Sequence, residues 1–424
     1  MSLHTAYYSR LLPKEITNTL YIMTRDELIQ TISDGFEKAK AGDAIATYKS
    51  ILPYAEDGSM PYKSHYAFGW IIYYALHQSD KKEISERKHM LARYFKLSLT
   101  KPHKLHSMVL TEAINLYKDA KEMAYGKKES ETVKFSIIKF ANIWDLSNLR
   151  DGDWRRKEVD GTKVGSTVEK LITAYVDELE ETATLPSDEF NAVMGKAMGQ
   201  YSDSDNFLSQ YATLCVMSGK QDEAAAILRK ALLVAPGKFH LWAKLASLTP
   251  AKDNPHLHVA LLYKGLLAPG QEKFKGRIRL SLADVLASRE AFPQALFELK
   301  KVKEIYSQNE WHLPSKYETI GKMIPKDTVA DNPEKLYRRV EYLADDEIYN
   351  ALPEIEVTKT YHKIPSETDT RFRNNKIAWR LTDSNGHNFW INPGRMRINP
   401  DLPMGTRLKI RVFNGKAVKA KLSE

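Results

Sequence analysis

Near the C-terminus, cationic and aromatic side chains alternate with aliphatic ones in a pattern that could bind a polyanion. Residues 407–413 read Arg-Leu-Lys-Ile-Arg-Val-Phe, and Asn414-Gly415 follows, a dipeptide typical of two-residue β-hairpin turns. Residues 416–422 then alternate again. Because successive side chains of a strand point to opposite faces, this alternation predicts a hairpin with one apolar face and one basic face.

The alternation assigns a face to each side chain. The inward set is Leu408, Ile410, Val412, Val418, Ala420 and Leu422. The outward set is Arg407, Lys409, Arg411, Phe413, Lys419 and Lys421. In the segment 388–392, Phe389 and Ile391 face inward, which leaves Trp390 outside. Cations bind phosphates and exposed rings stack on unpaired bases, so Trp390 and the outward set are the predicted nucleic-acid contacts. The alternative is a solvated basic face whose aromatic residues close the ends of a barrel.

These strands belong to a β-rich segment that we expect to span residues 355–424. Alternating runs at 355–361 and 377–381, a turn at 384–386 and the hairpin give four or five short strands. Such a set is typical of a small barrel of the OB-fold type, and an SH3-like barrel would explain the same pattern. Residues 405–412 resemble a central strand of the RNA-binding OB folds in the ribosomal and cold-shock classes.

The charge of the chain is concentrated in the same segment. Residues 355–424 contain fourteen basic and six acidic residues, so they carry +8 of the formal net charge of +9. An asymmetry of this kind indicates an anionic partner for the C-terminal segment.

The preceding sequence is helical and repetitive. Between residues 206 and 306, apolar and small residues recur at intervals of three and four, with helix breaks at Gly219 and Pro236. The positions that carry this pattern are Leu208, Tyr211, Ala212, Cys215, Ala224, Leu228, Ala231, Trp242, Leu245, Ala246, Leu282, Ala283, Leu286, Ala295, Leu299 and Val302.

This series resembles the tetratricopeptide repeat, a helix-turn-helix unit. The departures are residues 253–255, which disturb the second unit, and Arg279, which replaces the usual aromatic residue. The fold class that we expect is mainly α: a tetratricopeptide-like α-solenoid over residues 24–350, followed by the small all-β barrel over 355–424.

A basic segment at residues 148–165 interrupts the helical pattern. Asp160-Gly161 predicts a tight hairpin, and Ser166 and Glu169 form a capping box that restarts the helices. The candidate partner-binding residues of this segment are Trp154, Arg155, Arg156 and Lys157. We expect an ordered surface loop that presents them to a partner. The alternative is that Trp154 packs on the helices and the arginines are solvated.

The N-terminal residues 1–23 are expected to be an extension, because Thr24 and Glu27 form a capping box that starts the first helix. Met23 is therefore an alternative natural start to Met1. Neither a signal peptide nor an apolar run of about 18 residues is found, so we expect a cytoplasmic protein without a membrane span. The single cysteine, Cys215, excludes a disulfide framework within one chain.

Catalytic and metal-binding motifs are absent from the sequence. The pairs His103/His106 and His256/His258 lack a third ligand at helical spacing. Glycine-rich phosphate loops and a nucleophile elbow are also missing. We therefore expect no enzymatic activity, no catalytic residues, no metal, no cofactor and no small-molecule substrate.

Helical repeats followed by an OB-like domain resemble the tetratricopeptide–OB proteins of bacterial mobile-element conflict systems, and residues 153–157 are similar to a feature of that family. The resemblance implies a nucleic-acid-sensing adaptor that works beside separate enzymes. We expect the β domain to bind RNA or single-stranded DNA and the helices to dock a protein. The alternative is a scaffold whose basic domain binds an acidic protein and no nucleic acid. Exposure of Trp390 and Phe413 would favour the first.

Overall fold

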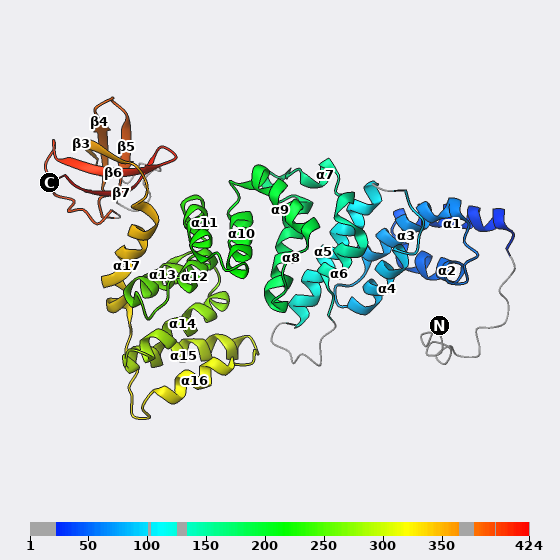
Figure 1. Cartoon of the computed structure of the whole chain (residues 1–424), viewed down its shortest axis with the longest axis horizontal. Helices are drawn as coiled ribbons and strands as arrows, with labels where there is room; N and C mark the ends of the chain where they lie inside the picture. Colours follow the sequence, from blue (N-terminus) through cyan, green and yellow to red (C-terminus); the bar gives the residue numbers. More distant parts are fainter. Residues whose placement is uncertain (1–22, 101–102, 125–133, 364–376, 395, 424) are drawn as a thin grey trace. The chain divides into compact units, whose positions relative to one another are not determined.

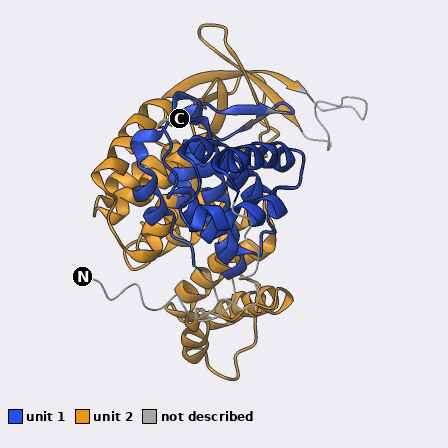
Figure 2. Cartoon of the chain, turned by 90° about the vertical axis from the view of Figure 1, so that its right-hand side faces the viewer, with its two compact units in different colours: residues 1–124, 128–174 blue, residues 125–127, 175–424 orange. Residues whose placement is uncertain are grey.

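The computed structural model describes residues 23–100, 103–124, 134–363, 377–394 and 396–423. The chain is mostly helical and ends in a small antiparallel sheet (Figure 1). It separates into two compact units (Figure 2), residues 1–124 with 128–174 and residues 125–127 with 175–424. The boundary lies within α8 (Thr167–Thr182). Among the described residues, none of the helices combines the length and hydrophobicity needed to span a bilayer.

The first unit contains the helices that precede α8 and the first part of α8 itself. The preceding helices are α1 (Arg25–Lys40), α2 (Ala44–Glu56), α3 (His65–Gln78), α4 (Ile84–Tyr94), α5 (Lys104–Ala124), α6 (Ile137–Trp144) and α7 (Asp151–Trp154), with 3-10 turns at Tyr62–Ser64 and Leu146–Asn148. The predicted capping box at the start of α1 is confirmed. The Glu27 amide donates to Thr24 Oγ1 at 3.3 Å, and the Thr24 amide donates to Glu27 Oε2 at 2.7 Å.

The predicted hairpin of the basic segment is also present in this unit. Strands β1 (Lys157–Val159) and β2 (Thr162–Val164) pair antiparallel across a turn in which Asp160 and Gly161 have φ of 50° and 73°. Positive φ at both positions matches the right-handed twist of the strands. The Ser166–Glu169 capping box follows, with the Glu169 amide donating to Ser166 Oγ at 3.1 Å.

The second unit continues with helices of which several pack against the next helix in the sequence, while the last one packs against an earlier helix. They are α9 (Asp188–Tyr201), α10 (Asp205–Met217), α11 (Gln221–Val234), α12 (Phe239–Ser247), α13 (Pro255–Leu267), α14 (Gly276–Ala287), α15 (Phe292–Gln308), α16 (Ser315–Met323) and α17 (Glu334–Tyr349). The helices predicted over residues 206–306 are confirmed. Their small residues, such as Ala212 and Ala231, are buried and allow close helix packing. One core cluster extends from Leu208 in α10 to Ile348 in α17.

The C-terminal sheet is a curled, five-stranded antiparallel half-barrel. Its strands are β3 (Glu354–Lys363), β4 (Ala378–Asp383), β5 (Asn388–Ile391), β6 (Arg407–Phe413) and β7 (Lys416–Leu422). The strand order is β5-β4-β3-β6-β7, and the sheet curls so that β5 and β7 approach each other. A separate core fills the concave side, with Trp379, Leu381, Leu408 and Ile410 completely buried.

A β-bulge changes the expected side-chain alternation in β7. Arg411 pairs with Lys419 but Val412 pairs with Ala417, so Val418 has no partner in β6. As a result Ala417, and not Val418, packs against the core of the sheet. The predicted inward orientation is therefore wrong for Val418, because an extra residue in one strand shifts the register. Leu422 pairs with the buried Leu408 and so lies on the predicted side of the sheet, but at the end of the strand it is 51% exposed.

Candidate nucleic-acid interface

Two aromatic rings and a guanidinium lie side by side on the convex face of the sheet. Tyr361 of β3 pairs with Arg380 of β4, which in turn pairs with Trp390 of β5. Tyr361 and Trp390 are 44% and 49% exposed, and their ring centroids are 6.2 Å apart with an interplanar angle of 80°. The Arg380 Cζ atom lies 5.5 Å from the centre of the Tyr361 ring. We call these three residues the outer row.

The sequence positions Arg380 and Trp390 on this face by simple alternation. Arg380 lies between Trp379 and Leu381, both fully buried, and Trp390 lies between the buried Phe389 and Ile391. The predicted outward orientation of Trp390 and the inward orientation of its two neighbours are confirmed. The sequence therefore also indicates that Arg380 faces outward, since it lies between two inward-facing apolar residues.

Tyr361 reaches the convex face through a second bulge. From Val357 onward, every second residue of β3 faces the core, and this alternation alone would also bury residue 361. The register of β3 and β4 shifts between Lys359 and Tyr361, so Thr360 is an extra residue and the next side chain turns outward. The sequence contains no clear signal for this bulge, and Tyr361 could not be predicted as part of the interface.

Hydrogen-bonding groups lie directly beside the outer row. Thr360 and Thr382 are linked through their hydroxyl groups at 2.7 Å, and Thr382 Oγ1 donates to Asn388 Oδ1 at 2.9 Å. Arg380 Nε reaches Thr360 Oγ1 at 3.4 Å. Asn388 is exposed. Flat rings beside a neutral amide and hydroxyl groups offer stacking surfaces and donors or acceptors for the edges of bases.

One cation of the basic segment lies inside the half-barrel. Lys359 is 2% exposed, its Nζ donates to the Leu402 carbonyl at 2.5 Å, and it lies 4.0 Å from the centre of the Trp379 ring. Desolvation lowers the pKa of Lys359. Lys359 therefore contributes to the charge count of the segment but not to its surface.

The cations of β6 and β7 that were predicted to contact phosphates form ion pairs with acids of the same chain. Glu354 forms ion pairs with Lys421 at 3.1 Å, Arg411 at 3.2 Å and Lys409 at 3.8 Å. Arg407 is exposed, whereas Phe413 is only partly exposed. The structure thus brings three predicted cations together around one carboxylate.

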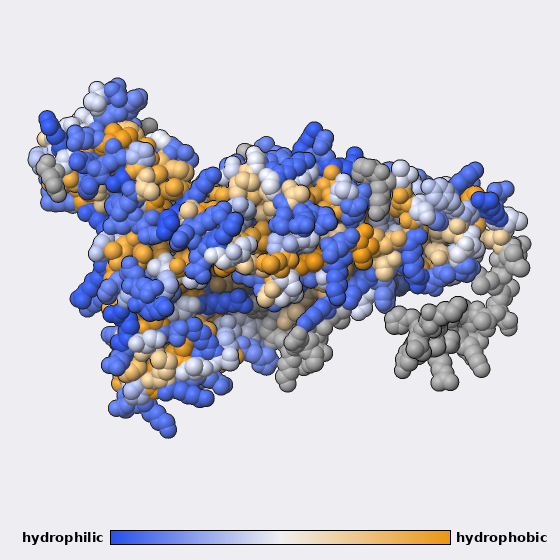
Figure 3. Space-filling model, viewed as in Figure 1, coloured by the Kyte–Doolittle hydropathy of each residue, from blue (hydrophilic) through white to orange (hydrophobic). Residues whose placement is uncertain are grey.

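The remaining predicted cation of β7 contacts a helix. Lys419 forms an ion pair with Asp346 of α17 and donates to Asn350 Oδ1 at 2.9 Å. Arg411 also donates to the Leu352 carbonyl just after α17. In Figure 3 the visible surface of the sheet is largely hydrophilic, with smaller hydrophobic areas between the polar ones.

The basic segment of the first unit is not arranged as expected. Residues 151–154 form a short helix, and Trp154 is 4% exposed within the core of the unit. Arg156 forms two hydrogen bonds with the buried Glu169, from Nε at 3.0 Å and Nη2 at 2.8 Å. The expectation that Trp154 is presented to a partner is therefore wrong, because an apolar ring beside an apolar core is buried. Arg155 and Lys157 are exposed.

The groups considered for chemistry lie in structural environments. Cys215 is buried in α10, where desolvation raises the pKa of its thiol. His106 is buried and its Nδ1 contacts the Tyr94 hydroxyl. Within the described ranges, no three His, Cys, Asp or Glu side chains lie where they could together hold a metal ion.

Comparison with known proteins matches the helices of the second unit to a protein family. No curated protein matches the chain. Over residues 207–344, from α10 to α17, the chain is similar to a family described as a domain of unknown function, DUF7017.

Proposed function

We propose that the C-terminal domain binds RNA or single-stranded DNA through the outer row. The observation that carries the proposal is the alignment of Tyr361, Arg380 and Trp390 on one exposed face. Aromatic rings and arginine planes stack on unpaired bases, and base–aromatic stacking contributes about 1–3 kcal/mol per base. A duplex keeps its bases stacked on each other, so this face favours single strands.

The strand order supports the OB-type barrel as the fold of this domain. In such a barrel the first strand lies between the second and the fourth, and the third and fifth strands approach each other. The order β5-β4-β3-β6-β7, with β5 near β7, fits this description. An SH3-like barrel would place the last strand beside the first, but β7 neighbours β6 and β5. OB-type domains bind oligonucleotides on the strands that correspond here to β4 and β5.

We further propose that the helices provide a docking surface for a protein partner. Successive helical hairpins from α10 to α15, with small residues at their contacts, support the resemblance to tetratricopeptide repeats. The whole chain would then be a non-enzymatic adaptor, consistent with the resemblance to tetratricopeptide–OB proteins of bacterial conflict systems.

Binding titrations on the full chain test this function. We expect labelled single-stranded RNA or DNA to bind more tightly than the matching duplex after purification with nuclease and high salt. Trp390→Ala should weaken single-strand binding by about 1–3 kcal/mol, with the dependence on salt unchanged, because the ring stacks and carries no charge.

The control for this substitution is Tyr62→Ala, since Tyr62 is an aromatic residue of the first unit that is 63% exposed. It should leave affinity unchanged. Because Trp390 is half-exposed, both variants should keep the melting temperature of the wild type. Equal affinity of the wild type and Trp390→Ala for every strand would contradict the proposal. Binding of an acidic protein without any binding of nucleic acid would support the scaffold alternative.

A further inference from the structure

The cations of β6 and β7 form a second surface that nucleic-acid phosphates could occupy. Residues 354, 356 and 358 lie on the same convex side of β3 as Tyr361, because residues 355, 357 and 359 face the core and the bulge restores Tyr361 to the outside. From Glu354 to Tyr361 the strand covers roughly 23 Å. One single strand can span that distance, since an OB-type domain covers about 4–16 nucleotides.

Glu354 occupies the centre of this second surface. It lies opposite Arg411 in the strand register and forms ion pairs with Lys409, Arg411 and Lys421. The hydrogen bond from Lys421 lowers the pKa of Glu354, and the three cations lower it further, although desolvation raises it. The carboxylate is therefore ionised at neutral pH and takes the place that a phosphate would take among the same donors.

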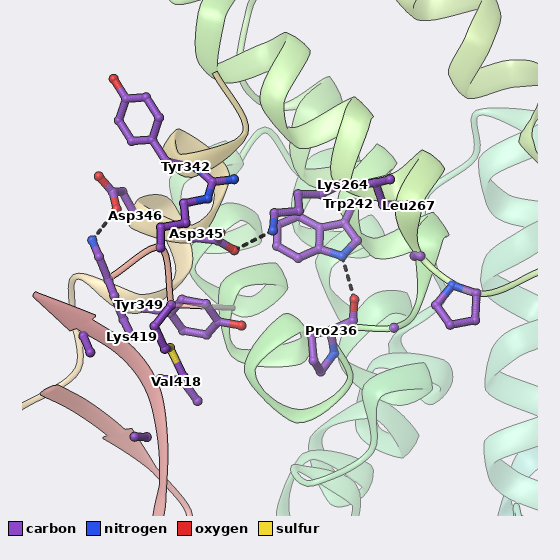
Figure 4. A pocket seen from close by; sticks show the side chains of 17 residues that line it. Pro236, Trp242, Lys264, Leu267, Tyr342, Asp345, Asp346, Tyr349, Val418 and Lys419 are labelled. Carbon is purple, nitrogen blue, oxygen red and sulfur yellow. Dashed lines mark hydrogen bonds and ion pairs between the residues drawn. The ribbon is translucent and has the colours of Figure 1, made fainter. Parts of the chain in front are cut away.

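The end of α17 supplies a second acid. Asp346 forms an ion pair with Lys419, and Figure 4 shows the two side chains directed at each other across the edge of a cavity of about 570 Å³. Asp345 turns instead to Lys264, which lies 2.9 Å away. Neighbouring residues of one helix thus have separate roles: Asp346 contacts the sheet and Asp345 contacts α13.

These ion pairs are of a kind that phosphates can replace. Their side chains are partly exposed: 26% for Glu354, 58% for Lys421 and 33% for Asp346. Exposed ion pairs contribute little, about 0–1 kcal/mol each. One carboxylate among three cations also leaves an excess positive charge, which still attracts a polyanion.

We propose that Glu354 and Asp346 are intramolecular competitors of nucleic-acid phosphates for the cations of β6 and β7. The inference rests on the proposed function and adds a regulatory contact to it. Short strands bind the outer row alone, whereas a strand that also reaches β6 and β7 must exchange these two carboxylates for phosphates. Contact between α17 and the sheet thereby limits affinity, and an event that draws Asp346 away from Lys419 raises it.

The test compares matched charge-neutralising variants of the full chain. Glu354→Gln frees three cations, so affinity for a long single strand should rise about three- to tenfold at low salt. The slope of log affinity against log salt should steepen by about 0.7 for each cation that gains a phosphate. The control is Glu356→Gln, on the same strand and face. It removes the same charge, but Glu356 makes no ion pair within the described ranges.

A second matched pair tests the contact with α17. Asp346→Asn should raise affinity and steepen the slope, whereas Asp345→Asn should do neither. Glu354→Gln and Glu356→Gln could also raise affinity equally, with no change of the salt slope. That result would mean that only the net charge of the domain matters. The inference would then fail, while the proposed function would stand. If neither the wild type nor any variant binds single strands, the proposed function fails and the inference with it. Melting temperatures close to the wild type establish that each variant is folded.

Discussion

Arg155 and Arg156 are neighbours in the sequence but lie in different environments. Arg155 is exposed, whereas the guanidinium of Arg156 makes two hydrogen bonds to Glu169. Glu169 is 7% exposed and accepts another hydrogen bond from the Ser166 amide at 3.0 Å. Arg156 therefore joins the end of the β1–β2 hairpin to the first turn of α8. A buried carboxylate that loses such a partner keeps its desolvation cost.

The two arginines should consequently respond differently to alanine substitution. Arg156→Ala should lower the free energy of unfolding by about 2 kcal/mol, the size expected for hydrogen bonds to a charged group. Arg155→Ala should change it by less than about 0.5 kcal/mol, as is usual at exposed positions. Urea denaturation followed by circular dichroism measures both. Equal, small effects would show that Arg156 is also dispensable for folding and available to a partner.

Single residues also limit what the sequence can predict about the interface. The inward Phe389 and Ile391 and the outward Trp390 follow from alternation and are confirmed. Tyr361 and Val418 do not follow, because bulges shift their strands by one residue. A one-residue shift moves every later side chain to the other face, and the bulge depends on pairing with a distant strand.

The helices of the second unit are connected by a buried polar network. Glu298 of α15 is 1% exposed and accepts hydrogen bonds from Arg279 of α14 at 2.9 Å and from the Tyr337 hydroxyl of α17 at 3.0 Å. Arg279 also reaches Glu272 at 3.2 Å. The residue that departs from the repeat pattern thus has a physical role, since its charge is needed to satisfy Glu298.

Removing one member of this network should be costly. Glu298→Ala should lower the free energy of unfolding by about 3–5 kcal/mol, because it leaves the buried Tyr337 hydroxyl without its acceptor and removes the buried partner of the Arg279 guanidinium, whose side chain is only 18% exposed. The matched control is Glu304→Ala on the same helix. Glu304 is 53% exposed and, in the part of the chain that the structure describes, pairs only with Lys301, so the change should be below about 0.5 kcal/mol. Chemical denaturation gives the free energy of unfolding of both variants. A larger loss for Glu298→Ala than for Glu304→Ala would support a structural network, and equal losses would reject it.

The sequence predicts secondary structure better than it predicts tertiary contacts. Helices from α10 to α15 follow from the spacing of residues such as Leu208, Ala212 and Cys215, because a helix face is set by neighbours three and four positions away. The β6–β7 hairpin follows from Asn414-Gly415 for the same local reason. Contacts between distant segments, such as Lys419 with Asp346, depend on how β7 packs against α17 and leave no periodic signal.

At the scale of the whole molecule, the net positive charge and the largest hydrophobic core of the second unit lie in different segments of the chain. Residues 355–424 carry +8 of the net +9, so most of the attraction for a polyanion belongs to the C-terminal segment, part of which lies outside the described residues. The sheet has a core of its own around Trp379, and the cluster that runs from α10 to α17 contains none of its residues. Lys419 joins β7 to α17 and its end through an ion pair with Asp346 and a hydrogen bond to Asn350. The helices should therefore fold without the sheet, but without most of the positive charge.

A chain that ends after Pro353 tests this division of roles. It keeps every described helix and the core cluster that runs from α10 to α17, so its circular dichroism and cooperative thermal unfolding should resemble those of the helices in the full chain. Its affinity for single-stranded nucleic acid should fall at least about tenfold, since it lacks the outer row and the cations of β6 and β7. The matched comparison is full-length Trp390→Ala, which removes stacking but keeps the charge and should bind with intermediate affinity. If the shortened chain is folded and binds as tightly as the full chain, the helices carry the nucleic-acid site, and the charge of the sheet serves another anionic partner.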